Sequence, residues 1–190
     1  MKKQIITIAG RPGSGKSTTA HMVADLLGYK HFSSGDLFRE ISQQRGMDVV
    51  QSNLNAENGK SDIDEIVDSR LQEIGKAENH LVIDSRTAWH WIPTAFKVYL
   101  NLDMQVAAER ILQDITPERL ADENIPNNPG EYAGQLKQRL DSENRRYESL
   151  YGIDPSDMSN YDLVVDTAAN NPEQVTQLVV DAYGAWLGDS

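Results

Sequence analysis

Cysteine is absent from this chain of 190 residues, and aromatic residues make up only 7% of it. The lack of cysteine excludes disulfide bonds, zinc sites built from thiolates and cysteine nucleophiles. No stretch approaches the roughly 18 consecutive apolar residues that a membrane-spanning helix needs. The first residues also lack the apolar core of a secretion signal. We therefore expect a cytoplasmic protein that does not act on membranes.

Positive charge is also scarce. The chain has 18 Lys and Arg against 29 Asp and Glu, which gives a formal net charge of -11. Such a surface repels the phosphates of nucleic acids and of anionic membranes, and no run of basic residues offers a local patch. We expect no nucleic acid partner. An anionic small substrate would need individual arginines gathered at one site.

Short apolar segments alternate with helical patterns along the chain. Strands are expected at 4–9, 29–33, 80–84, 96–101 and 163–166. Helices are expected at 16–27, 35–45, 62–76, 103–113, in a short piece from 116, at 129–151 and from 172 onward. Asp62 and Glu65 have the spacing of a capping box. Five short strands separated by helices predict an α/β fold, a single domain over residues 1–190 with a parallel sheet covered on both faces.

The first predicted strand runs into a glycine-rich segment that fits the phosphate-loop pattern G-x-x-x-x-G-K-[ST] at every required position. Its glycines allow successive backbone N–H groups to turn inward and form an anion cradle at the start of a helix. The lysine reaches the β- and γ-phosphates of a nucleoside triphosphate, and the serine hydroxyl ligates Mg²⁺. The predicted ATP-binding residues are Gly10, Arg11, Pro12, Gly13, Ser14, Gly15, Lys16, Ser17 and Thr18.

Asp84 ends the third predicted strand. In a doubly wound sheet, sites lie at the carboxyl ends of strands, so this carboxylate is placed to hold Mg²⁺ through a water molecule. The alternative is an aspartate that caps a turn at the end of its strand. The predicted metal site is thus Ser17 with Asp84, and the predicted cofactors are ATP and Mg²⁺.

Beyond the phosphate loop, a series of segments resembles the nucleoside monophosphate kinases, and most closely the short cytidylate kinases. The segments are Ser33-Ser34-Gly35-Asp36-Leu37-Phe38-Arg39, Val82-Ile83-Asp84-Ser85-Arg86, Ala108-Glu109-Arg110-Ile111, Arg139-x3-Glu143-x2-Arg146 and Tyr161-Asp162-Leu163-Val164-Val165-Asp166-Thr167. In this order they cover most of residues 4–183. The resemblance implies a P-loop kinase three-layer fold with a helical acceptor-binding lobe at about 36–76 and a short lid at about 114–150. It also implies transfer of the γ-phosphoryl group of ATP to CMP or dCMP.

The resemblance assigns roles to individual residues, and the chemistry of phosphoryl transfer agrees with them. Arginine binds phosphate oxygens through a planar fork, and the reaction needs positive charge around three phosphates. The residues expected to catalyse the transfer are Lys16, Arg110, Arg139 and Arg146, with Arg146 holding the acceptor phosphate as an alternative. The residues expected to bind the acceptor are Asp36, Arg39, Asp68, Arg70, Arg86 and Glu143, with Asp68 and Arg70 reading the base. The donor adenine is expected near residues 166–171.

One departure from the family pattern and several alternatives stay open. Similar kinases usually carry a basic residue where this chain has Gln113 and Asp114, so its lid supplies fewer positive charges. The acceptor could be another small molecule, such as another nucleotide or shikimate. A nucleotide-dependent switch and a lapsed kinase are further alternatives, although the chain has no N-K-x-D guanine motif. We expect a monomer whose partners are small molecules.

Overall fold

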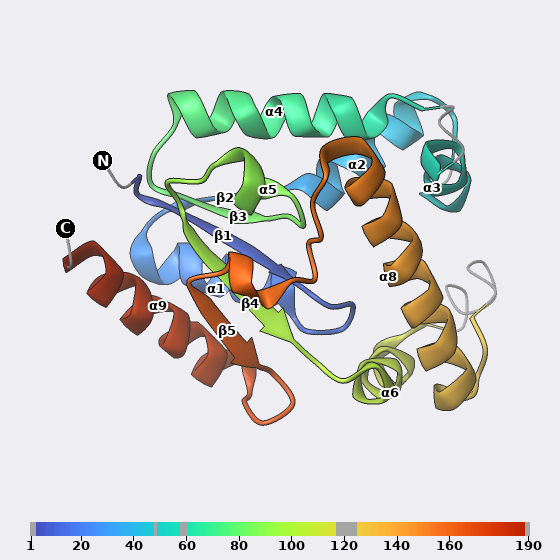
Figure 1. Ribbon diagram of the computed structural model, residues 1–190. Coiled ribbons are helices and arrows are strands. Elements are labelled where there is room, and N and C mark those ends of the chain that lie inside the picture. The colour runs from blue at the N-terminus through green and yellow to red at the C-terminus, as the bar shows by residue number, and fades with distance from the viewer. Residues whose placement is uncertain (1–2, 48, 58–60, 117–124, 189–190) are drawn as a thin grey trace.

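A five-stranded sheet forms the centre of the computed structural model, which describes residues 3–47, 49–57, 61–116 and 125–188 (Figure 1). The strand order is β2-β3-β1-β4-β5, and every neighbouring pair is parallel. The strands are β1 (Ile5–Gly10), β2 (Lys30–Ser33), β3 (Leu81–Asp84), β4 (Phe96–Asn101) and β5 (Leu163–Asp166). The predicted parallel sheet is confirmed, with each strand within one residue of its expected bounds.

Helices cover both faces of this sheet (Figure 1). They are α1 (Lys16–Leu27), α2 (Ser34–Gln44), α3 (Val49–Glu57), α4 (Ile63–Ala77), α5 (Ala88–Trp91), α6 (Met104–Asp114), α8 (Pro129–Tyr151) and α9 (Pro172–Gly188), with a 3₁₀ helix η1 (Met158–Asn160). The sequence did not predict α3 and α5. The short helix expected from residue 116 falls on residues 117–124, outside the described part of the chain.

Alternating side chains divide the core into two layers, because successive residues of a strand point to opposite faces. On β1, Ile6 and Ile8 pack with Val23 of α1 and Val179 of α9. Ile5 points the other way and joins the cluster formed by α4 and α5. Both faces of β1 are thus buried, as expected for the central strand of a parallel sheet.

The start of α4 differs from the sequence prediction. Asp62 is the N-cap residue, but its side chain makes no capping hydrogen bond. Its carboxylate instead accepts a hydrogen bond from Arg45 Nη1 at 2.5 Å, an ion pair between α4 and the end of α2. The predicted capping box is therefore wrong, because a partner distant in sequence competes with the helix N-terminus for the carboxylate.

The carboxyl ends of β1, β2 and β3 meet at one edge of the sheet and position the candidate site. Ser33 at the end of β2 pairs with Asp84 at the end of β3. Asp84 also pairs with Ile8, two residues before β1 ends at Gly10. The phosphate loop and the acceptor segment therefore begin at the same edge of the sheet, on opposite sides of β3, although they are more than twenty residues apart in the sequence.

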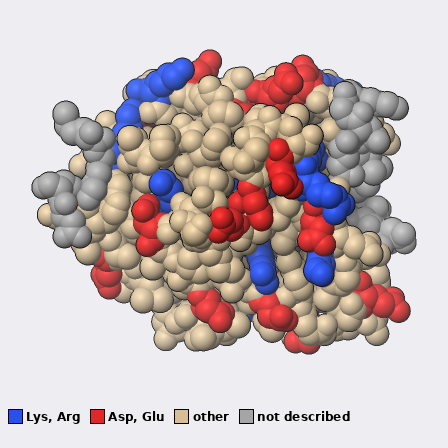
Figure 2. Space-filling model, in the orientation of Figure 1, with Lys and Arg blue, Asp and Glu red and all other residues tan. Residues whose placement is uncertain are grey.

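On the face shown in Figure 2, acidic side chains are spread over the surface and basic side chains lie in a few small groups. This distribution agrees with the net charge of -11. Among the helices that the structure describes, none combines the length and apolarity needed to cross a bilayer.

Gly10 is the residue whose replacement should most disturb this core. Its φ is 151°, and a Cβ atom there would lie 2.3 Å from the carbonyl oxygen of Leu100. We expect Gly10→Ala to lower the free energy of unfolding by about 3 kcal/mol, since neither backbone can move without breaking the β1–β4 pairing. Urea denaturation measures this change. Gly184→Ala is the matched control, because the site is helical and nothing beyond its own helix backbone lies within 4 Å of the new Cβ.

The control should gain up to about 1 kcal/mol, the usual advantage of alanine over glycine in a helix. A Gly10→Ala protein within about 0.5 kcal/mol of wild type, the usual range of a harmless surface change, would contradict the packing described for β1 and β4.

Candidate active site

The loop that follows β1 has the geometry of an anion cradle. Gly13 and Gly15 have positive φ values of 69° and 79°, which turn the backbone N–H groups of the loop toward one side. Gly15 is the N-cap of α1, and no described side chain caps that end of the helix. The first N–H groups of α1 are therefore available to an anion, and the helix dipole favours negative charge there.

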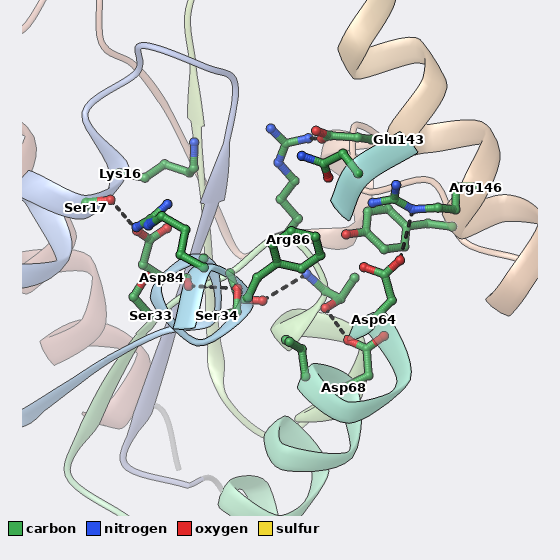
Figure 3. Close-up of a pocket in the computed structure, with 18 of the residues that line it drawn as sticks. Lys16, Ser17, Ser33, Ser34, Asp64, Asp68, Asp84, Arg86, Glu143 and Arg146 are labelled. Atoms are coloured by element: carbon green, nitrogen blue, oxygen red, sulfur yellow. Dashed lines mark hydrogen bonds and ion pairs between the residues drawn. The ribbon is translucent and has the colours of Figure 1, made fainter. Parts of the chain in front are cut away.

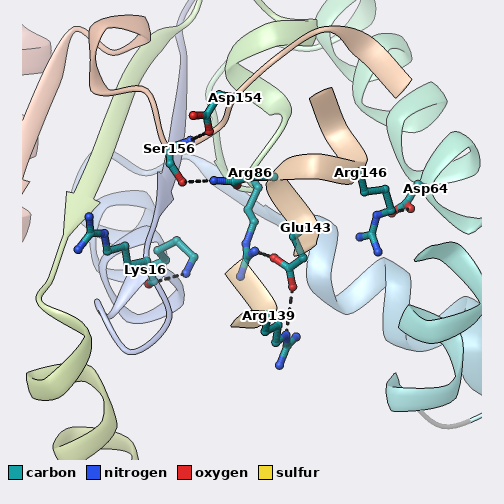
Figure 4. A network of polar contacts seen from close by, with 10 residues as sticks. Lys16, Asp64, Arg86, Arg139, Glu143, Arg146, Asp154 and Ser156 are labelled. Carbon is teal, nitrogen blue, oxygen red and sulfur yellow. Dashed lines mark hydrogen bonds and ion pairs between the residues drawn. The ribbon is translucent and has the colours of Figure 1, made fainter. Parts of the chain in front are cut away.

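Lys16, the first residue of α1, is held close to this loop. Its Nζ donates a hydrogen bond to the carbonyl oxygen of Arg11 at 3.1 Å (Figure 4). Burial and the positive charge of Arg86 lower the pKa of Lys16 to about 8. The charged lysine thus lies in a site that disfavours positive charge until an anion arrives.

Ser17 and Asp84 form a pair of oxygen ligands next to the lysine. Ser17 Oγ donates a hydrogen bond to Asp84 Oδ2 at 2.5 Å (Figure 3). Asp84 is 7% exposed and ends β3, as the sequence predicted. A hydroxyl and a carboxylate are hard oxygen donors of the kind that Mg²⁺ prefers, and Mg²⁺ usually completes its shell with water and substrate phosphates. The pair therefore fits the predicted metal.

A cavity of about 270 Å³ lies beside Lys16, between the ends of β2 and β3 and the helices α2, α4 and α8 (Figure 3). Charged side chains from these elements meet in it. The sequence-predicted residues that line it are Lys16, Ser17, Arg39, Asp68, Asp84, Arg86, Arg139, Glu143 and Arg146. The structure thus gathers into one site arginines that are spread over more than a hundred positions of the sequence.

Glu143 connects two of these arginines (Figure 4). Its carboxylate forms ion pairs with Arg86 and with Arg139, whose Nε lies 3.1 Å from Oε1. The Glu143 side chain is only 8% exposed, and that of Arg86 is 22% exposed. One buried carboxylate thus partly neutralises two arginines. A phosphate group also carries negative charge and oxygens that accept hydrogen bonds, so it can bind these arginines beside the carboxylate or in its place.

A second cavity, of about 610 Å³, lies on the other side of the phosphate loop. Gly13, Gly15 and Thr18 form one wall, and Asn170 and Asn171 of the β5–α9 connection form another. The loop expected to hold the donor base is thus next to the phosphate loop.

Arg110 lies in the second cavity and not in the first. Its Nη2 donates a hydrogen bond to the carbonyl oxygen of Thr167 at 2.8 Å. Gln113 and Asp114, where the resemblance led us to expect a basic residue, line this cavity too. Arg110 therefore lines the cavity where the donor is expected, together with Gln113 and Asp114.

Two predicted acceptor residues do not reach the first cavity. Arg70 forms ion pairs with Glu73 and Glu78 on the outer side of α4 and is about half exposed. Asp36 forms an ion pair with Arg39 and is also mainly exposed. The prediction that Arg70 reads a base with Asp68 is corrected, because residues two apart on a helix point in different directions.

The first cavity also contains residues to which the sequence assigned no role. Asn53, Asp64 and Thr87 line the first cavity. Asp64 could have been found from the sequence, because it precedes Asp68 by four positions and therefore shares its helix face. Asn53 belongs to α3, which was not predicted, and Thr87 has no motif of its own.

The parallel sheet, the phosphate loop and the arginine-lined cavity define the class of P-loop kinases. The family model described as an AAA domain matches residues 9–127. Solved structures share the fold, including a shikimate kinase from Acinetobacter baumannii in complex with shikimate, with a TM-score of 0.61, 17% identity and coverage of 96% of this chain and 94% of that one. An uncharacterized protein from Eubacterium ventriosum gives a TM-score of 0.65 at 15% identity, covering 93% of this chain and 96% of its own.

Closer similarity in sequence is found among curated cytidylate kinases. The cytidylate kinase of Halobacterium salinarum is 37% identical over 188 residues, which cover 97% of this chain and 92% of that protein. The cytidylate kinase of Methanocaldococcus jannaschii is 35% identical over 182 residues, 94% of this chain and 96% of that protein. The chain therefore belongs to the cytidylate kinase family, and it is a phosphotransferase.

Proposed function

We propose that this protein transfers the γ-phosphoryl group of ATP to CMP or dCMP, giving ADP and CDP or dCDP. The observation that carries the proposal is the place of the phosphate loop between two cavities. Lys16 and Ser17 face the arginine-lined cavity, whereas Gly13 and Thr18 face the other. A donor and an acceptor bound in these cavities would bring their phosphates together at Lys16.

On the donor side, the backbone of the loop and Lys16 would hold the β- and γ-phosphates, and Arg110 would approach them from the second cavity. The adenine would lie against Asn170 and Asn171, which line the second cavity. Ser17 would ligate Mg²⁺ directly and Asp84 through a water molecule. Bound there, Mg²⁺ would supply positive charge that offsets the charge of the phosphates during transfer.

On the acceptor side, Arg39 and Arg86 would bind the monophosphate. Arg139, which lines the same cavity, would act on the transferring group, and Glu143 would hold Arg86 and Arg139 in position. A phosphate oxygen of the acceptor attacks the γ-phosphorus, and the bond from that phosphorus to the β–γ bridging oxygen breaks, so that ADP leaves with the electron pair. The second pKa of a phosphate monoester is about 6, so the attacking oxygen is already ionised at neutral pH and needs no general base. Catalysis then rests on positioning and on positive charge.

The helical segments around the first cavity would act as moving parts of one domain. Residues 36–76 supply α2, α3 and α4 as the acceptor-binding lobe, and residues 114–150 supply most of α8 as part of the lid. Ion pairs such as that between Arg86 and Glu143 connect the lid to the sheet across the cavity. Closure around both substrates would exclude water and so suppress hydrolysis of ATP.

The direct test is ADP formation with ATP and Mg²⁺ against CMP, dCMP, UMP, AMP, GMP, dTMP and shikimate. The proposal predicts strong stimulation by CMP or dCMP and little by the others. Stimulation mainly by another compound would refute the cytidylate assignment while keeping the kinase. Basal hydrolysis that no acceptor stimulates would favour a nucleotide-dependent switch.

Because the pKa of Lys16 is lowered, we expect ATP binding to depend on pH and to be accompanied by proton uptake. The phosphates of ATP favour the charged lysine, so its pKa should be higher in the complex than the value of about 8 in the free protein. ATP affinity should therefore be greatest below pH 8 and should fall as the pH rises through 8 toward the pKa of the complex. Calorimetric titration of ATP in two buffers of different ionisation enthalpy should show proton uptake that is small at pH 7 and approaches about one proton near pH 9.

The Lys16→Met protein is the control for this titration, since it retains the loop but has no group to protonate. Equal proton uptake by both proteins at pH 9 would assign the effect to another group and contradict the stated role of Lys16.

A further inference from the structure

Three aromatic rings form a row next to the turn that carries Arg86. The ring of Trp89 in α5 lies 5.7 Å from that of Tyr161, which lies 5.0 Å from that of Tyr99 in β4. Trp89 is 9% exposed and Tyr99 is 2% exposed. None of the three is among the described residues that line the first cavity. The row therefore lies outside the cavity and would act on an acceptor only through other residues.

The indole of Trp89 holds the backbone of Arg86. Its Nε1 donates a hydrogen bond to the carbonyl oxygen of Arg86 at 2.9 Å. Arg86 lies in the turn between β3 and α5, where the backbone N–H of Thr87 also donates to Ser85 Oγ at 3.3 Å. Because α5 has only four residues, it contains too few internal hydrogen bonds to fix this turn by itself. The path of the backbone at Arg86, and so the direction in which its side chain starts, depends on Trp89.

The row also contacts the segment that follows α8. The hydroxyl of Tyr161 donates a hydrogen bond to the carbonyl oxygen of Pro155 at 2.8 Å. The next residue, Ser156, accepts a hydrogen bond at Oγ from Asn144 Nδ2 of α8 at 2.7 Å. The row is thereby connected to α8 through this segment.

Arg86 is supported at both of its ends. Trp89 holds its backbone, and the carboxylate of Glu143 on α8 forms an ion pair with its guanidinium (Figure 4). Asn144, the neighbour of Glu143 in the sequence, is the residue that bonds to the segment held by Tyr161. The row therefore joins the two supports of Arg86 to each other.

Packing alone does not require a tryptophan at this position. A phenylalanine would also bury an apolar ring, whereas the indole adds a polar N–H that needs a partner when it is buried. Trp91 of the same helix shows the difference, because its Nε1 is buried and makes no hydrogen bond within the described residues. An arginine that binds a phosphate through two N–H groups must be held within about 0.5 Å of its productive position, which requires supporting contacts.

We propose that Trp89 is a positioning residue for the phosphoryl transfer. Its indole N–H, with the ring packed against Tyr161, sets the turn so that the guanidinium of Arg86 meets the phosphate of the acceptor. The inference rests on the proposed function, because it assumes that Arg86 binds this phosphate.

The variant that tests the inference is Trp89→Phe, which keeps an aromatic ring and removes the N–H. The KM for CMP should rise at least about tenfold, since a small displacement of a group that orients a substrate has an effect of this size. The KM for ATP should stay within about twofold of wild type. Trp91→Phe is the matched control, because it makes the same change in α5 at an indole N–H without a hydrogen bond. Its KM values for CMP and ATP should both stay within about twofold of wild type.

Combining Trp89→Phe with Arg86→Ala separates positioning from a general loss of structure. If Trp89 acts through Arg86, the second change should lower kcat/KM for CMP no more than about twofold beyond Arg86→Ala alone. Independent effects that multiply in the double variant would overturn the inference. So would a Trp89→Phe protein whose rate falls only with its folded fraction while both KM values remain those of wild type.

Tyr161→Phe keeps the inference testable if Trp89→Phe does not fold. This change leaves the ring in the row and removes only the hydroxyl that bonds to Pro155. The KM for CMP should rise at least about threefold, about the effect of one lost neutral hydrogen bond, with the KM for ATP unchanged. An unchanged KM for CMP in this variant would overturn the inference while leaving the proposed function intact. If the wild-type protein does not phosphorylate CMP, the proposed function fails first and the inference fails with it.

Discussion

Replacing Lys16 with alanine is expected to lower kcat for phosphoryl transfer about 100- to 1,000-fold. Lys16 is the only lysine lining the first cavity within the described residues, and it stands where the proposed donor and acceptor phosphates meet. Removing a preorganised positive charge from a site that excludes water commonly costs about 3–4 kcal/mol of transition-state stabilisation. ADP formation with saturating ATP and acceptor measures the change.

Folding should not explain this loss. The pKa of Lys16 is lowered to about 8 by burial and by Arg86, so the folded free protein disfavours the charged form. At neutral pH the Lys16→Ala protein should therefore melt no lower than wild type. Lys30→Ala, which changes an exposed lysine on the edge strand β2, should keep wild-type turnover. Turnover by Lys16→Ala within tenfold of wild type would remove Lys16 from the reaction.

Replacing Arg86 with alanine is expected to lower kcat/KM for the monophosphate about 100- to 1,000-fold, with little change in the KM for ATP. Arg86 lies two residues after the end of β3 with its side chain mostly buried, and it lines the cavity, where its fork can bind two phosphate oxygens at once. Loss of such a desolvated, charge-assisted contact has an effect of this size. Initial rates with acceptor and ATP varied separately measure both constants.

A second variant is needed because Arg86 forms an ion pair with the buried carboxylate of Glu143. Arg86→Ala alone leaves Glu143 in its ion pair with Arg139, and a buried carboxylate that has lost one of two positive neighbours destabilises the fold. Combining it with Glu143→Gln should restore thermal stability but not kcat/KM. Recovery of activity in the double variant would show that Arg86 acts only by neutralising Glu143. Arg145→Ala, at an exposed position of α8, is the control for loss of one arginine.

Local sequence signals predicted the sheet and the phosphate loop, because both depend on short-range patterns. The apolar run of β1, the glycines of the loop and the end of α1 before Gly28 are all adjacent in the chain. The helix α5 was missed because four residues are too few to show a helical period. The predicted capping box at Asp62 was wrong because Arg45, which is distant in the sequence, donates a hydrogen bond to the Asp62 carboxylate.

The contacts of the first cavity could not be predicted in this way, because they join residues that are far apart in the sequence. The resemblance to cytidylate kinases named Arg86, Glu143 and Arg146, but no pattern paired Arg146 with Asp64. These two residues are separated by more than eighty positions, and only the packing of α8 against the acceptor-binding lobe brings them together. For the same reason the role of reading the base was wrongly assigned to Arg70. Arg70 belongs to α4, as Asp64 does, but its side chain forms an ion pair with Glu73 outside the cavity.

The central claim is that the two cavities hold a donor and an acceptor whose phosphates meet at Lys16. A compound in which adenosine and cytidine are joined by five phosphates tests it most directly, because it must occupy both cavities at once. The account predicts that this compound competes with both ATP and CMP and binds more tightly than either, with its adenosine in the second cavity and its cytidine in the first. Competition with ATP alone, at an affinity no higher than that of ATP, would contradict it.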